Sequence, residues 1–513
     1  MDKIDKTMLM PGASASSFYA PYLDTVISGD VSEEFSLADY FPEVRRVISV
    51  TAKAIPEGKF LSSGTVDCDG IVSFIVTYLG EDQTVASAPF VIQYSQTADI
   101  PDPTGDGGEL ICSTVAENPT CRVTEPRKLS LKAHLRTRIF ADEAMSGEEQ
   151  CTDENGATVT GADAVTVERL CTDGVSARVI CAAQSGTVSG TVRASNVSRA
   201  ISADGVINIV DAHADENKVV IRGEAVVFVL CQGTDGIYFT AREKEPFETS
   251  IAMAGARIGD MARAHGRCAS VTVNAGDGAM TFDVEYDLDA EIMRPETYSV
   301  CTDAYSTSFV STVQMCEREI FVPIKCGVFH LTQTGEIKRR SEAAAGEYPV
   351  SVCASAQVDK AEFSGGKMIL SGLILMQLGI AQNGDISPEE GKIPFSLTAD
   401  VPDTDVQNPV WRADVQVIDA TVRPDGDRIA SSAELAISVC ASDRRRVGCV
   451  DKVILDKSKP RTKSGGIRIY FPDEGESLWD IAKKYASCRR TLARINGWAD
   501  GTEKVGASPV VIE

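Results

Sequence analysis

One strand-rich pattern returns three times along the 513-residue chain, and this recurrence restricts the possible folds more than any other feature. Each copy opens with a run rich in Val and Ile, passes a glycine within a further strand, and reaches a Pro-Phe dipeptide. The phenylalanines of successive copies lie 157 and 148 residues apart. This interval is too long for a solenoid repeat and indicates tandem domains of one kind. The landmarks are residues 47–50, Gly64 and Pro89-Phe90; residues 206–209, Gly223 and Pro246-Phe247; and residues 350–352, Gly372 and Pro394-Phe395.

The residues between these landmarks predict the fold of each copy. Apolar and polar residues alternate as in half-buried strands, and helical periodicity is scarce. Each copy has room for roughly seven or eight short strands, with polar turns at residues 80–82, 233–236 and 383–385. The proline begins or edges a strand, where its missing N–H costs nothing, and the phenylalanine fills the core. We therefore predict a mainly β protein with three tandem antiparallel, sandwich-like repeats.

The C-terminal stretch has a different pattern. Ser477 is a helix N-cap, and Asp480 follows three residues later, close to the capping-box pattern. Asn496-Gly497 is suited to end a second helix, because both residues tolerate a left-handed conformation. Short apolar strands over residues 467–470 and 510–512 flank the helices, so we predict a small strand–helix–helix–strand unit. One apolar stripe at helical spacing consists of Leu478, Ile481, Ala482 and Tyr485.

This stretch resembles the LysM family in the run from Gly475 to Ala482, in Asn496 and in the apolar last strand. The resemblance implies a βααβ fold and binding of N-acetylglucosamine polymers, such as peptidoglycan or a chitin-like glycan. The binding groove would lie between the loop before the first helix and the loop after the second. A plain core role is the alternative for Leu478, Trp479 and Ile481. The groove residues that the resemblance implies are Gly475, Glu476, Ser477, Leu478, Asn496, Gly497 and Trp498.

The repeats resemble the SPOCS (spore coat and septum) family. The resemblance rests on residues 47–52 after residues 41–43, on the glycine strand and Pro-Phe, and on the signature at residues 303–307. A second landmark, Cys-Thr-Asp, occurs at residues 171–173 and 301–303. SPOCS repeats followed by one C-terminal LysM domain are the arrangement of a class of spore coat morphogenetic proteins. The resemblance implies a sporulation protein of the mother-cell cytoplasm that acts at the forespore surface. Its implied partners are the ATPase that polymerises as the basement layer of the coat and other coat proteins.

A basic segment precedes the C-terminal unit. Residues 443–513 carry a formal charge of +5, whereas the rest of the chain carries −29. Either the basic segment meets an acidic partner surface, or it is a solvated, flexible tether. The predicted division is an N-terminal segment without assigned structure (1–40), a first repeat (41–140), connecting strands with a second repeat (141–298), a third repeat (299–442), a basic flexible linker (443–466) and the LysM-like domain (467–513).

Composition excludes several functional classes. A net charge of −24 argues against nucleic-acid binding, which needs a basic face. No apolar run of 18 residues is present, so no membrane span is expected. The N-terminus lacks the apolar core of a secretory signal, and we expect retention in the cytosol. In that compartment the fifteen cysteines are expected to be reduced and to serve as small apolar side chains. The four histidines lie far apart, so no metal site is expected.

Catalytic signals are equally sparse. No phosphate-binding or dinucleotide-binding motif occurs, and 74 acidic residues are too many to single out a catalytic pair. We therefore expect a protein that is not an enzyme and takes no cofactor: an assembly scaffold with the LysM-like domain as its binding module. The alternative is a peptidoglycan-binding cell-wall protein or an accessory of a wall hydrolase. The missing export signal favours the scaffold.

Overall fold

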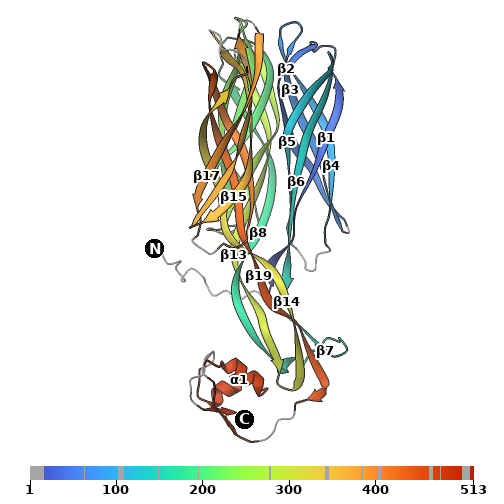
Figure 1. Cartoon of the computed structure of the whole chain (residues 1–513), viewed down its shortest axis with the longest axis vertical. Coiled ribbons are helices and arrows are strands. Elements are labelled where there is room, and N and C mark those ends of the chain that lie inside the picture. The colour runs from blue at the N-terminus through green and yellow to red at the C-terminus, as the bar shows by residue number, and fades with distance from the viewer. Residues whose placement is uncertain are drawn as a thin grey trace.

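The computed structural model describes most of the chain as β-sheet. The described residues are 17–512, except 63, 102–108, 147–148, 195, 277–278, 341–345, 383–384, 403–405, 462–465, 474 and 500–508. Six antiparallel sheets, each built around three strands, account for most of this region. They pair into three units that follow one another along the chain (Figure 1). The prediction of a mainly β, antiparallel protein is confirmed.

In the first unit the two sheets share one apolar core. Buried side chains of one sheet, such as Phe74 and Tyr78, belong to the same cluster as Leu131 and Leu135 of the other. One sheet has the order β2-β3-β4 and the other the order β1-β6-β5. The strands are β1 (Ser17–Ser36), β2 (Val44–Ser62), β3 (Thr65–Gly80), β4 (Val85–Asp99), β5 (Leu110–Glu125) and β6 (Lys128–Ser146).

The second unit repeats this arrangement. Its sheets have the orders β11-β10-β9 and β12-β13-β8, and Ile221 of one shares a core with Phe282 and Leu288 of the other. The strands are β8 (Val167–Val192), β9 (Val197–Asp215), β10 (Lys218–Gly233), β11 (Tyr238–Ala252), β12 (Met261–Gly276) and β13 (Ala279–Ser306).

The third unit has the orders β15-β16-β17 and β14-β19-β18, and β7 (Gln150–Asp153) adds a parallel edge to β19. Its core joins Leu370 and Met376 to Leu435 and Ile437. In all three units the last strand lies between the first strand and the penultimate one. The recurring sequence pattern therefore has a recurring strand order as its counterpart. The strands are β14 (Phe309–Lys338), β15 (Tyr348–Ser364), β16 (Lys367–Gln382), β17 (Asp385–Asp400), β18 (Pro409–Asp425) and β19 (Arg428–Pro460).

Four of the predicted details need correction. Each unit has six strands of at least 15 residues rather than seven or eight short ones, because several polar residues lie on exposed faces of long strands instead of in turns. The first unit begins with β1, inside the segment 1–40 left without structure. The flexible linker is wrong for most of residues 443–466, because β19 continues to Pro460. There the three consecutive arginines at residues 444–446 pair with β14 and precede buried Val450 and Val453, so strand pairing and burial outweigh the charge.

The fourth correction concerns the glycine of the first repeat. Gly64 lies in the turn between β2 and β3, with φ of 80°. The residue that corresponds to Gly223 and Gly372 is Gly70. Each of these three glycines pairs with an aromatic residue whose ring covers it, so that an added Cβ would lie within 2.7 Å of the ring or its hydroxyl. A glycine in a strand interior thus marks a close approach by a neighbour. The covering residues are Tyr94, Phe247 and Phe395.

Two long ribbons, β8–β13 and β14–β19, extend below the three units as a stalk (Figure 1). We define the stalk as residues 167–178, 294–323 and 443–460. Its interior contains small apolar clusters, one of which includes Val167, Ala304 and Val453. The described part of the C-terminal unit, within residues 467–512, lies at the lower end of the stalk (Figure 1). No helix in the part of the chain that the structure describes is long and apolar enough to cross a membrane.

Candidate binding site

The C-terminal unit has the predicted order of elements. β20 (Arg468–Tyr470) is followed by α1 (Leu478–Lys484), α2 (Arg489–Ile495) and β21 (Val510–Ile512), and the two strands pair antiparallel. Both helices lean on one apolar core that includes Leu478, Ile481 and Leu492. A core this small has little stability to spare, so each of its buried side chains matters.

The predicted start of α1 is confirmed. Ser477 Oγ accepts a hydrogen bond from the Asp480 backbone N–H at 3.1 Å, and the Asp480 carboxylate accepts one from the Ser477 N–H at 3.2 Å. These reciprocal bonds form a capping box. The core alternative holds for Leu478, Trp479 and Ile481, which are 1%, 6% and 0% exposed. Leu478 can therefore offer a ligand only its backbone.

The loop before α1 is fixed by bonds within the unit. The Glu476 carboxylate accepts hydrogen bonds from the Tyr470 hydroxyl at 2.8 Å and from the Asp473 N–H at 3.1 Å. Gly475 is exposed and has φ of 88°, a conformation that favours glycine. The carboxylate of the groove residue Glu476 is therefore hydrogen-bonded within the loop itself.

The groove residues at the end of α2 also include one whose side chain is hydrogen-bonded within the unit. The Asn496 side chain donates to the carbonyls of Leu492 and Val511, at 2.9 and 2.8 Å, and accepts from the Val511 N–H at 2.7 Å. It thereby ties the end of α2 to β21. Gly497 adopts a left-handed conformation at the end of the helix, with φ of 71°. Trp498 is half-buried and packs against the same core as Leu478, so both loops border one core.

The C-terminal unit is anchored to the stalk through α1. The Trp479 indole N–H donates to the Asp303 carboxylate at 2.8 Å, and Lys483 binds both oxygens of that carboxylate at 2.6 and 2.7 Å. The Tyr305 hydroxyl donates to the Ser487 carbonyl at 2.7 Å, and its ring meets that of Trp479 edge-on at 4.9 Å. Burial raises the pKa of the Tyr305 phenol.

Sequence reasoning missed this anchor. It assigned Asp303 and Tyr305 to the signature of the repeats and Trp479 to the motif of the C-terminal unit. No spacing rule connects residues that lie 176 positions apart. The available signal was that both motifs contain residues suited to a hydrogen bond across an interface, a carboxylate in one and an indole in the other.

An exposed apolar strip runs along the first strand of the C-terminal unit. Ile467, Ile469 and Phe471 are 71%, 64% and 70% exposed, and these alternate positions point to one side of the strand. We call these three residues the apolar strip. Arg468 lies between Ile467 and Ile469 in the sequence, so its side chain points to the other side of the strand, and exposed Arg490 and Arg494 lie on α2 of the same unit.

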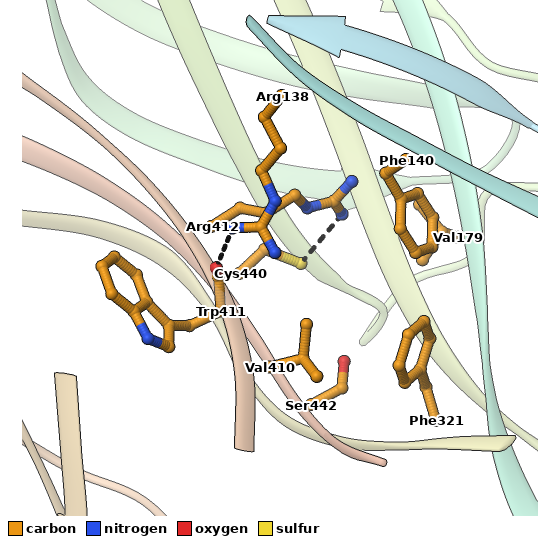
Figure 2. Close-up of a pocket in the computed structure, with 9 residues that line it drawn as sticks. All are labelled: Arg138, Phe140, Val179, Phe321, Val410, Trp411, Arg412, Cys440 and Ser442. Atoms are coloured by element: carbon orange, nitrogen blue, oxygen red, sulfur yellow. Dashed lines mark hydrogen bonds between the residues drawn. The ribbon is translucent and has the colours of Figure 1, made fainter. Parts of the chain in front are cut away.

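A concavity lies where the three β units meet (Figure 2). In Figure 2 the stacked rings of Phe140 and Phe321 lie on one side, and the Trp411 indole points away from them. The Arg138 side chain donates to the Trp411 carbonyl, and the Arg412 guanidinium lies 4.6 Å from the centre of the Phe140 ring.

The charged groups around this concavity are already paired. Arg263 donates to Glu291 at 2.9 Å and to Asp414 at 2.8 Å, while Arg412 forms an ion pair with the other oxygen of Glu291. Burial opposes ionisation of Glu291, but Arg263 and Arg412 outweigh it and keep the pKa of Glu291 below its ordinary value. Cys440 also donates to this carboxylate, at 3.0 Å. The concavity is therefore part of the junction between units.

The site and the fold together define a class: a mainly β chain of three topologically equivalent units, with a small α/β unit on a stalk. Comparison with protein-family models, with curated proteins and with solved structures finds no match for this chain. Among the described residues, no three His, Cys, Asp or Glu side chains are grouped so that they could hold a metal ion.

Proposed function

We propose that the chain is a non-enzymatic scaffold for assembly of the bacterial spore coat. In this proposal the three units are sandwich-like SPOCS repeats, and the C-terminal unit is a LysM domain that binds a protein. The partner is the ATPase that forms the basement layer of the coat, and the place is the forespore surface in the mother cell. The observation that carries the proposal is the exposed apolar strip on the unit at the end of the stalk.

The chemistry of the strip suits a protein partner. Three large apolar side chains at alternate positions, one in β20 and one on either side of it, are costly to leave in water. Ile467 and Ile469 offer neither hydrogen bonds nor a ring face, which are the contacts that hold a sugar. A strand or an amphipathic segment of a protein can cover all three at once.

The hydrogen bonds of the groove residues point the same way. Among the predicted groove residues, Glu476 and Asn496 have the longest polar side chains, and both are hydrogen-bonded within the C-terminal unit. A glycan would have to displace these bonds, which would leave the Val511 backbone groups without their partner. Protein binding at the apolar strip requires no such exchange.

Charge gives a third argument. Residues 443–513 carry +5 within a chain of −24, and exposed Arg490 and Arg494 lie on α2 of the unit that carries the apolar strip. Basic side chains on the unit that carries an apolar patch increase the rate of encounter with an acidic protein surface. The basic segment was expected either to meet an acidic partner or to be a flexible tether. Most of it is strand β19 in the stalk, which argues against a tether. The exposed arginines of the C-terminal unit remain suited to an acidic partner.

Glycan binding is the second candidate. It is favoured by Gly475 and Gly497, which leave exposed backbone on both loops, and by half-buried Trp498, which follows Gly497. In that case purified peptidoglycan fragments would bind the full chain, and Trp498→Ala would weaken this binding. The apolar strip would then be irrelevant to binding.

A binding assay with the full chain separates the two candidates. We expect Ile469→Ser/Phe471→Ser to weaken binding of the purified basement-layer ATPase at least about tenfold, which corresponds to ~1.4 kcal/mol. Ile258→Ser is the matched control, because Ile258 is 73% exposed but lies between β11 and β12, far from the strip in the chain. Unchanged ATPase binding by the double variant would refute the proposal, as would binding to peptidoglycan alone.

A further inference from the structure

The stalk, and the β14–β19 ribbon directly above it, contain cysteines that face each other across paired strands. Cys316 pairs with Cys449 and Cys326 with Cys440 in the β14–β19 ribbon, and Cys171 pairs with Cys301 in the β8–β13 ribbon. Directly opposed residues in antiparallel strands have Cβ atoms about 4.5–5.5 Å apart. A disulfide requires about 3.5–4.5 Å between the Cβ atoms, so a small local adjustment suffices to join such a pair.

The three pairs differ in how free their thiols are. Cys326 and Cys440 are both buried, and Cys440 donates to the Glu291 carboxylate. Cys171 is exposed, but its partner Cys301 is 2% exposed and donates to the Asp303 carbonyl at 3.3 Å. In each of these two pairs, one thiol is therefore hydrogen-bonded to a group other than its partner cysteine.

Cys316 and Cys449 have the geometry for reaction. Their Sγ atoms lie 3.4 Å apart, in direct contact. Cys316 is half-buried and therefore reachable by a small reagent, whereas Cys449 is buried beneath it. Burial, and next the hydrogen bond with Cys316, raises the pKa of the Cys449 thiol to about 11. The more exposed Cys316 is consequently the thiol that reacts first.

We propose that Cys316 and Cys449 form a reversible dithiol–disulfide site in the stalk, which a low-molecular-weight disulfide oxidises. The Cys316 thiolate attacks one sulfur of this reagent, forms a mixed disulfide and expels one thiolate. The Cys449 sulfur, after loss of its proton to solvent, then attacks Cys316 Sγ and expels the second thiolate. Two cysteine thiols and one disulfide reagent thereby become one protein disulfide and two small thiols.

The position of the site gives the bond a mechanical consequence. It would join β14 to β19 in the part of the stalk that leads to the C-terminal unit. A small apolar cluster supports the ribbon there, with Tyr298, Val300 and Ile320 beside Cys449. The bond would close a loop across 133 positions, which restricts the unfolded chain and stabilises the stalk.

The test is oxidation of the full chain with excess oxidised glutathione, followed by alkylation and mass spectrometry. We expect one linked peptide that contains Cys316 and Cys449, two hydrogens lighter than the reduced pair and cleaved by dithiothreitol. In Cys449→Ser the glutathione adduct should accumulate on Cys316, because the second step is blocked. In Cys316→Ser the link should be absent.

Cys121→Ser provides the control, since Cys121 is half-buried and pairs with Leu131 rather than with a cysteine. It should leave the 316–449 link unchanged. The proposal is overturned if both thiols are alkylated after full exposure to the reagent. It is equally overturned if Cys316 keeps its glutathione adduct in the unsubstituted chain, or links to another cysteine.

Discussion

The indole N–H of Trp479 donates to the carboxylate of Asp303 at 2.8 Å, and this bond connects the C-terminal unit to the stalk. Lys483 and the Tyr305–Ser487 bond reinforce the contact. These contacts hold the C-terminal unit in one orientation, in which α1 faces the stalk. The apolar strip belongs to a different element of the unit, β20 and the residues beside it.

Removal of this carboxylate should loosen the unit. In Asp303→Ala, Trp479 and Lys483 both lose their acceptor, at a cost of about 1–3 kcal/mol for hydrogen bonds to a charged group. The expected result is roughly 10- to 100-fold faster hydrogen exchange of the α1 amides. Asp173→Ala is the matched control, because Asp173 has the same place in the other Cys-Thr-Asp landmark but is exposed on β8. Identical exchange in both variants would show that this contact does not anchor the unit.

Asn496 tests whether a groove residue serves the fold or a ligand. Its amide makes three hydrogen bonds that join α2 to β21. Asn496→Ala should destabilise the C-terminal unit by about 1–3 kcal/mol, because backbone groups of Val511 lose their partner. The measurement is hydrogen exchange of α1 and α2 amides. Arg494→Ala, at an exposed position of α2, should change stability by less than about 0.5 kcal/mol. Unaltered exchange together with lost glycan binding would assign the Asn496 side chain to a ligand instead.

Features that depend on residues close together in the chain could be predicted from the sequence. Alternation predicted the strands, and the Ser477–Asp480 spacing predicted the capping box, because both depend on neighbours within a few residues. The threefold recurrence of the strand-rich pattern was detectable for the same reason, since each copy preserves its own local pattern. In the first copy the prediction selected Gly64 instead of Gly70, because spacing alone cannot tell a turn glycine from one that lies under a ring.

What the sequence could not provide are the contacts between distant segments. Asp303 and Trp479 belong to motifs that were interpreted separately, and their contact depends on how the stalk ends. The arginines of residues 444–446 indicated a linker by composition, but pairing with β14 makes them part of a strand. Burial against a neighbouring ribbon decides such cases, and that neighbour lies more than a hundred positions away.

The buried network at the junction should be sensitive to loss of one charge. Glu291→Gln would leave Arg263 and Arg412 buried with less compensation, which typically costs about 3–5 kcal/mol. We expect a lower denaturant midpoint for the transition that reports on the second and third units. Glu336→Gln is the control, since its pair with Arg428 is 60% exposed on both sides and such pairs contribute little. Equal midpoints for the two variants would contradict a structural role for the network.

Asp142 should give the first unit a pH dependence of unusual sign. Its carboxyl group is buried on β6, where burial raises its pKa to about 6 and the hydrogen bond from the Glu109 N–H only partly opposes the shift. The folded state therefore binds this proton more tightly than the unfolded state, in which the pKa is about 3.9. The contribution of Asp142 is fully present below pH 4 and is lost as the pH rises through 6, by about 3 kcal/mol at most.

Asp142→Asn removes the titration but keeps an acceptor oxygen for Glu109. We expect the variant to match the parent chain near pH 4 and to be more stable at pH 7.5, when the transition of the first unit is followed by denaturant unfolding. Asp30→Asn is the comparison in which stability should depend on pH in the opposite direction. Hydrogen bonds from Lys132 and then His134 lower the pKa of Asp30, so the stabilisation by Asp30 is gained as the pH rises. A stability difference between Asp142→Asn and the parent that stays constant from pH 4 to 7.5 would mean that Asp142 is already ionised in the folded chain at pH 4.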